Sequence, residues 1–249
     1  MNVDLTRIIQ WSIINRLTLN PGKSQSIIIY KYSIDTTTFS QIILNDTVIP
    51  FANTVRNLGL FINKSLTWDC HIRVICKRVY NILRVFWILS RFANSQIRRK
   101  LFLAYIFPHF LYGDVIMFGM SKYCERKLTL LFNAWVRYVH NLRKYDHISH
   151  VANSLLGCSL GSYYNFRAVV FLYILIKKRK PEYLFDKLKF ARSVRTMNLI
   201  IPNNCCMHLN KSLFVAGVML WNSLPTVIRN INVLASFRMK IMELLINKQ

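Results

Sequence analysis

The sequence predicts an α+β fold that is mostly helical, with a small β-containing piece followed by helices. Short β-branched runs separated by turn signals occupy the stretch 25–62, as is typical of strands. From about residue 69 onward, apolar residues recur at the spacing of a helix face. The chain is 53% apolar and has only seven Gly and six Pro. It can therefore bury a sizeable core and has little material for flexible linkers.

The first piece is expected to hold one helix and several strands. Residues 4–17 carry apolar side chains at helical spacing, and Pro21-Gly22 ends that helix. Asn45-Asp46 is a turn signal between two β-branched runs. The expected strands cover 25–30, 40–44, 47–50 and 55–62.

The rest of the chain is expected to be helical almost to its end, with Thr67 or Asp69 as the first N-cap. The expected helices cover 69–91, 95–107, 121–142, 147–156, 162–178 and 233–246. The least periodic segment is 190–212. We divide the chain into three parts on this basis: 1–66, 67–150 (a helical domain) and 151–249 (a C-terminal helical region).

The net charge is the strongest compositional signal. Lys and Arg number 34 against 10 Asp and Glu, which gives +24. The basic excess is 3 in residues 1–66, 10 in 67–150 and 11 in 151–249. Such a field repels itself and calls for a polyanion. Nucleic acid is the partner we expect first, and an anionic membrane surface is the second candidate. The alternative is an unusually basic surface that is only solvated.

Targeting and membrane signals are weak. Residues 1–11 lack the basic segment and apolar core of a signal peptide. The apolar run 168–176 is too short to span a bilayer, and 101–120 contains Pro108, His109 and Asp114, which favours a buried core. We expect an intracellular protein, nuclear or cytoplasmic, without a transmembrane segment.

The six cysteines do not form a recognisable metal site. No CxxC occurs, and Cys205-Cys206-Met207-His208 lacks zinc-finger spacing. Without a secretory signal, we expect reduced thiols packed as small hydrophobes.

A basic stripe along the helix expected over 69–91 predicts nucleic-acid binding. Its members fall within about 40° of one face, and the apolar side chains of the same segment centre on nearly the opposite side. The stripe consists of Arg73, Lys77, Arg84 and Arg91, and Arg98, Arg99 and Lys100 extend it into the next helix. Only Asp69 is acidic between residues 65 and 113. The alternative is an ordinary solvated face, but such faces usually alternate Glu with Lys.

The sequence contains no group of residues that is typical of a catalytic site. Two-metal polymerisation needs carboxylates a few ångströms apart, whereas no two of the seven Asp and three Glu are adjacent and no aromatic-x-Asp-Asp turn occurs. The histidines assemble no site, and no Gly-flanked nucleophile elbow accompanies Ser149-His150. We therefore expect neither an enzyme as the chain stands nor a bound cofactor.

Several short motifs, in order, carry a family resemblance. Asn20-Pro21-Gly22-Lys23-Ser24 precedes an apolar strand, and Val55-Arg56-Asn57-Leu58-Gly59-Leu60 opens another. Together they resemble the last two palm motifs of the reverse transcriptases of non-LTR (LINE-like) retrotransposons. The segments 104–114, 133–137 and 141–149, and Leu220-Trp221-Asn222-Ser223-Leu224-Pro225 near the end, are similar to later parts of the jockey-type members. Cys158-Ser159 stands where the family often has Trp-Leu.

The resemblance implies roles for individual residues. Asn20 and Lys23 would lie beside the incoming nucleotide, and Lys23 could neutralise the departing pyrophosphate. Leu58 and Gly59 would lie at the turn that supports the primer end. The part 67–150 would be a thumb that holds the template–primer duplex. The family binds Mg²⁺ with aspartates that lie just upstream of the first motif. This sequence begins downstream of the position where those aspartates would lie.

We therefore expect a truncated reverse transcriptase: a palm remnant, a thumb and a C-terminal region, with residual binding of RNA, DNA or hybrid duplex and no polymerase activity of its own. One alternative is a structural or interaction protein, or a non-functional product of a decayed retroelement reading frame. Another is an enzyme whose missing palm is supplied in trans or by an upstream exon.

Overall fold

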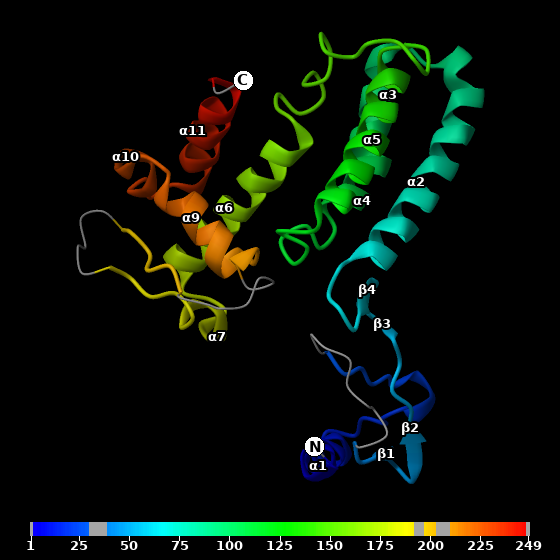
Figure 1. The fold of residues 1–249 in the computed structure, drawn as a ribbon, viewed down its shortest axis with the longest axis vertical. Coiled ribbons are helices and arrows are strands. Elements are labelled where there is room, and N and C mark those ends of the chain that lie inside the picture. The colour runs from blue at the N-terminus through cyan, green and yellow to red at the C-terminus, as the bar shows by residue number, and fades with distance from the viewer. Residues whose placement is uncertain (1, 30–38, 192–196, 203–209, 248–249) are drawn as a thin grey trace. The chain divides into compact units, whose positions relative to one another are not determined.

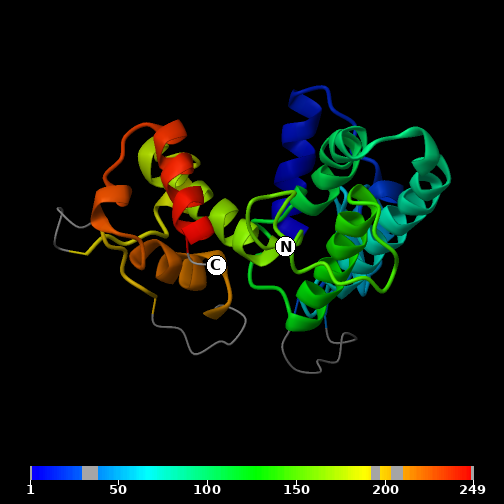
Figure 2. The same ribbon diagram turned by 90° about the horizontal axis from the view of Figure 1, so that it is seen from above.

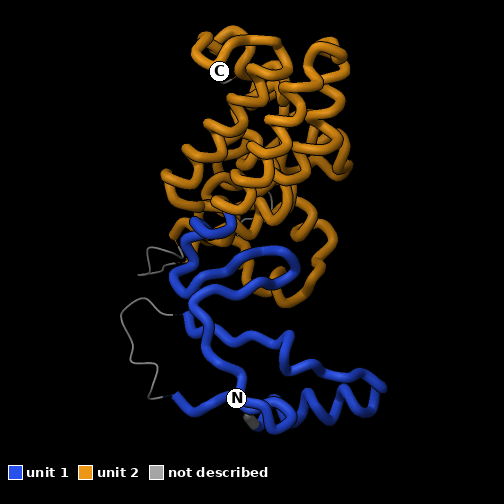
Figure 3. The backbone as a smooth tube through the Cα atoms, turned by 90° about the vertical axis from the view of Figure 1, so that its right-hand side faces the viewer, with its two compact units in different colours: residues 1–71 blue, residues 72–249 orange. Residues whose placement is uncertain are grey.

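The computed structural model describes residues 2–29, 39–191, 197–202 and 210–247. The fold is α+β and mostly helical, as the sequence predicts. Packing divides the chain into two compact units, residues 1–71 and 72–249 (Figure 3). The boundary expected at 66/67 thus lies a few residues early, and the one expected at 150/151 does not separate compact units.

The first unit combines one helix with two β-hairpins. Helix α1 (Asn2–Ile14) is followed by the 3-10 turn η1 (Pro21–Lys23). Strands β1 (Ile42–Leu44) and β2 (Thr47–Ile49) form one antiparallel hairpin, and β3 (Thr54–Asn57) and β4 (Leu60–Asn63) form the other. The small core of this unit consists of Ile42, Leu44 and Ile49, against which Leu5, Ile9, Leu19 and Phe51 pack.

Two strand predictions in this unit are wrong. The single strand expected over 55–62 is the β3–β4 hairpin, which turns at Leu58-Gly59. Leucine is not a typical turn residue, so the apolar pattern of the two short strands predicted a single strand. The strand expected over 25–30 is reduced to an isolated bridge between Ser26 and Phe51, and Tyr30 lies outside the described residues.

The second unit begins with a helical hairpin built on aromatic packing. Helix α2 (Asp69–Ile88) leads into it and continues through the 3-10 turn η3 (Leu89–Phe92) to α3 (Ser95–Leu101). Helix α5 (Lys122–Val139) lies against α3. The Trp135 ring of α5 is fully buried, with ring centroids 5.6 Å from Phe86 and 5.9 Å from Phe102.

The helix expected over 95–107 is interrupted. After α3 the backbone passes through a π-helical segment, η4 (Phe102–Ile106), and then α4 (Phe107–Leu111). Pro108 has no N–H to donate and cannot continue an α-helix from the preceding turn, and a π segment is one way in which a helix absorbs such an interruption.

The C-terminal helices pack around α6 (Leu160–Lys178). The remaining elements are α7 (Glu182–Phe185), the π segment η6 (Leu213–Gly217), α9 (Val218–Asn222), α10 (Thr226–Arg229) and α11 (Leu234–Asn247). Helix α11 lies beside α6 in both views (Figures 1 and 2). Leu172, Trp221 and Phe237 are the fully buried centre of this core.

The helix expected over 147–156 is also wrong, because this stretch is a succession of turns. The backbone bonds with both ends inside it are of the i→i+3 kind, such as Val151 N–H to the Ile148 carbonyl at 2.9 Å. Serine and asparagine side chains compete with helical backbone bonds and favour turns.

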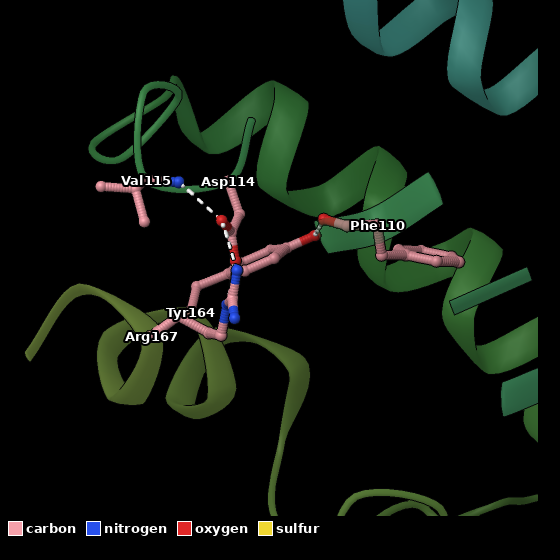
Figure 4. Close-up of polar contacts among 5 residues, drawn as sticks. All are labelled: Phe110, Asp114, Val115, Tyr164 and Arg167. Carbon is pink, nitrogen blue, oxygen red and sulfur yellow. Dashed lines mark hydrogen bonds and ion pairs between the residues drawn. The ribbon is translucent and has the colours of Figure 1, made fainter. Parts of the chain in front are cut away.

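An ion pair joins the two parts that the sequence suggested were separate domains. The Asp114 carboxylate, only 4% exposed, accepts from Arg167 Nε at 2.7 Å and Nη2 at 3.3 Å (Figure 4). Its Oδ1 also accepts from the Val115 N–H at 2.8 Å, and Tyr164 donates to the Phe110 carbonyl at 3.2 Å. Burial raises the pKa of the Tyr164 hydroxyl. These bonds fix the loop after α4 to α6, within the compact unit 72–249.

No helix within the described ranges is both long enough and apolar enough to cross a bilayer. The four cysteines in those ranges form no disulfide, and Cys124 and Cys158 are buried. Cys205 and Cys206 lie outside them.

Candidate nucleic-acid interface

Helix α2 separates an apolar face from a basic one. Ile72 and Val79 are fully buried and Leu83 nearly so. Arg73, Lys77 and Arg84 lie on the opposite, exposed side. The spacing of these three cations therefore gives the solvent-facing line that the sequence predicts, which we call the α2 stripe. Asp69 is the only acid in α2.

The other predicted members of the basic surface do not lie on that line. Arg91 is exposed but belongs to η3, beyond the end of α2, so the helical spacing no longer places it with Arg84. Arg99 and Lys100 are exposed on α3. The sequence-predicted surface thus consists of the α2 stripe and separate cations near the α2–α3 connection.

Arg98 does not belong to the exposed basic surface that the sequence predicts, because its side chain is buried and makes hydrogen bonds within the fold. Nε donates to the Ala93 carbonyl at 2.9 Å, and Nη2 to the Ser90 carbonyl at 2.7 Å. Nη1 donates to the Tyr138 carbonyl at 3.0 Å and to Asn141 Oδ1 at 2.9 Å. The guanidinium also lies 5.3 Å from the Tyr138 ring centroid. Arg98 therefore fastens the η3–α3 connection to the end of α5, and four of its five N–H donors are used within the fold.

Two aromatic residues on α2 border the stripe, and the sequence reasoning missed them. Tyr80 is 40% exposed and Trp87 is 38% exposed. Tyr80 follows Arg73 by seven residues and Trp87 follows Tyr80 by seven, so they share one edge of the stripe; that spacing was the available signal. Partly exposed rings beside cations can stack on bases. The Trp87 ring packs edge-to-face against the Tyr138 ring, and the two ring centroids are 5.5 Å apart.

The palm-like motif around Asn20 is a capped turn. Asn20 Oδ1 accepts from the Lys23 N–H at 3.3 Å, and the Asn20 carbonyl accepts from the Ser24 hydroxyl at 2.9 Å. Pro21 begins the 3-10 turn with its preset φ. Lys23 is exposed at the end of this turn. Asn20 therefore has a local structural role, and Lys23 is presented to solvent.

The second palm-like motif lies on a neighbouring element of the same unit. Leu58 and Gly59 form the β3–β4 turn with φ of 46° and 86°, as a two-residue type I′ turn requires. The Arg56 N–H donates to Gln25 Oε1 at 3.0 Å, so the segment after Lys23 is joined to the strand before Leu58. The two motifs therefore belong to one connected structure.

The acids of this unit lie on separate elements in the part that the structure describes. Asp4 Oδ1 lies 3.9 Å from Arg7 Nη1. Asp46 is at the β1–β2 turn, and Asp69 begins α2. Asp35 lies outside the described residues. Over both units, no group of three or more His, Cys, Asp or Glu side chains gathers within those residues.

Comparison with known proteins finds no matching family model, no matching curated protein and no matching solved structure. Functional inference for this chain therefore rests on its own residues.

Proposed function

We propose that this chain is part of a non-LTR retrotransposon reverse transcriptase, with a palm remnant, a thumb and a C-terminal helical region. Its biochemical function is then to bind RNA, DNA or a hybrid duplex through the α2 stripe. The order of the sequence motifs supports the family. The observation that carries the binding function is the exposure of Arg73, Lys77 and Arg84 along one side of a helix whose other side is buried.

The electrostatics of α2 support a polyanionic partner. No acid occurs between Asp69 and Asp114, so no carboxylate of this stretch competes with phosphates for the stripe. Each phosphate that a protein neutralises releases counterions and adds about 0.9 to the slope of log affinity against log salt. Three contacts would therefore contribute about 2.7 to that slope.

The first experiment measures fluorescence anisotropy of a labelled primer–template against salt concentration. The variant is Arg73→Glu/Lys77→Glu/Arg84→Glu, which reverses the stripe. The control is Lys178→Glu/Lys180→Glu/Lys189→Glu, which reverses three exposed cations elsewhere with the same change of net charge. We expect the stripe variant to lose at least tenfold in affinity near physiological salt and to have a slope shallower by about 2–3, while the control loses less.

The outcomes separate an interface from a diffuse field. Equal losses in the two variants would assign the binding to overall charge rather than to α2. Weak affinity of the unmodified chain at low salt would refute the proposal and favour the structural or decayed-frame alternative.

We further propose that the chain does not polymerise on its own, since its acids are scattered along the sequence. Primer extension with the purified chain and Mg²⁺ tests this directly. Templated synthesis would show that the polymerase site is complete or that scattered acids converge on it.

A further inference from the structure

One end of the second unit exposes apolar side chains that the α2 stripe does not include. Here α2 passes through η3 into α3, and α5 ends nearby. Phe92 is 84% exposed and Ile88 74%, and Tyr145 is 85% exposed on the loop that follows α5. Leu89 and Ile97 are about half exposed. We call these five residues the apex; Ile88, Leu89, Phe92 and Ile97 lie at or beside the connection from α2 to α3, which can be followed in Figure 1.

The apex is a built surface rather than a frayed loop. The buried Arg98 guanidinium donates to Ser90 and Ala93 on one side of it and to Tyr138 and Asn141 on the other. These bonds hold the η3 turn against the end of α5, so the backbone segments that carry the apex side chains are joined to each other.

Exposed cations lie next to the apex residues in the sequence. Arg91, Arg99, Arg143 and Lys144 are all exposed, and the Lys144 ammonium lies 5.1 Å from the Tyr145 ring centroid. The acid nearest in sequence, Asp146, accepts from the Arg143 backbone N–H at 2.7 Å. Exposed apolar side chains and exposed cations thus occur together in the segments that form the apex.

We propose that the apex docks on an anionic lipid surface. Apolar side chains would enter the boundary between headgroups and acyl chains, and the neighbouring Arg and Lys would contact anionic headgroups. This mode of binding needs no spanning helix. It involves residues outside the α2 stripe and does not depend on the proposed nucleic-acid function.

Two other occupants fit less well. A second copy of the chain would bring two sets of cations together, which charge repulsion opposes. Nucleic acid would suit the cations and the rings of Phe92 and Tyr145, but Ile88, Leu89 and Ile97 have no π face on which a base can stack. Exposed aliphatic side chains with cations beside them match a membrane interface better.

The test is co-sedimentation of the full chain with phosphatidylcholine vesicles, with and without about one-third phosphatidylserine. The variant Ile88→Asp/Phe92→Asp places two carboxylates at the apex. The matched control is Ile116→Asp/Val227→Asp, because those side chains are also well exposed, at 61% and 79%, and the change in charge is the same. Circular dichroism confirms that each variant is folded.

We expect the unmodified chain and the control to bind the phosphatidylserine vesicles and not the neutral ones, and the apex variant to bind at least tenfold more weakly than the control. Equal binding by the two variants would overturn the proposal, because it would mean that overall charge suffices. Absence of vesicle binding by the unmodified chain would overturn it as well. If the apex variant instead lost affinity for RNA while no form bound vesicles, the apex would be a nucleic-acid surface.

Failure here is distinguishable from failure of the proposed function. Reversal of Arg73, Lys77 and Arg84 is read out by the salt dependence of primer–template binding, and the apex variant by vesicle binding. Either result can hold without the other.

Discussion

Replacing Arg98 by Ala should strongly destabilise the second unit, although a basic residue in an acid-free stretch looks like a surface cation. The change removes a guanidinium that donates four hydrogen bonds between 2.7 and 3.0 Å. It also removes the cation over the Tyr138 ring. The acceptors stay behind, and the Tyr138 carbonyl is in a buried bond.

The size of the effect follows from which acceptors lose their partner. A hydrogen bond from a charged donor contributes about 1.5–3 kcal/mol, but bonds that share one side chain are not additive. Asn141 is exposed, so its amide can turn to water, whereas the carbonyls of Ser90, Ala93 and Tyr138 are at least partly shielded. We expect a loss of about 3 kcal/mol in the free energy of unfolding, of the 5–15 typical for a domain.

The assay is urea unfolding followed by near-ultraviolet circular dichroism, which reports on aromatic packing such as the Trp135–Tyr138 contact at 5.4 Å. Arg99→Ala is the control, since Arg99 is the exposed neighbour and the loss of charge is identical; we expect a change within about 0.5 kcal/mol. Arg98→Lys keeps the charge but loses the planar fork and should fall between the two. Similar values for Arg98→Ala and Arg99→Ala would refute the structural role.

Three further predictions concern backbone and protonation. Gly119→Ala should cost several kcal/mol, because φ is +76° and the new Cβ would stand 1.9 Å from the Lys211 carbonyl oxygen, whereas Gly161→Ala meets open space and should be neutral in the same urea titration. Leu58→Asn should raise the stability of the first unit by up to about 1 kcal/mol in thermal unfolding, because a left-handed Leu is strained; a lower melting temperature would contradict this. Burial lowers the pKa of His71, so stability is complete above the unfolded value near 6.5 and falls as pH drops below it; His71→Gln should flatten that slope between pH 7 and 5.5, and an unchanged slope would exclude His71 as its source.

Local patterns predicted the elements whose causes are local. The helices α1, α2, α5, α6 and α11 follow from apolar spacing within each segment. The Asn45-Asp46 turn is confirmed, with φ of 46° and 58°, because both residue types tolerate the left-handed region. Leu58-Gly59 adopts a turn of the same kind. The local pattern did not predict it, because leucine does not signal a turn, and only the family resemblance implied a turn there.

The candidate site shows the same limit more sharply. Arg73, Lys77 and Arg84 could be placed on one face because a helix fixes their relation. The burial of Arg98 could not be predicted, since two of its acceptors are 40 and 43 residues further along the chain. Likewise, the Asp114–Arg167 pair spans 53 residues, so the division at residue 150 could not be corrected from local composition.

Arg98 also offers a way to separate the two surfaces proposed for the second unit. The α2 stripe depends on the helix itself, whose buried face packs through Ile72, Val79 and Leu83. The apex depends on the η3 turn, which Arg98 holds against the end of α5. In an Arg98→Lys variant that remains folded, the apex should lose its fixed geometry while the stripe keeps its three cations. Vesicle binding should therefore weaken, and the salt slope of primer–template binding should not change. A reduced salt slope in that variant would instead mean that the two surfaces form a single polyanion-binding site.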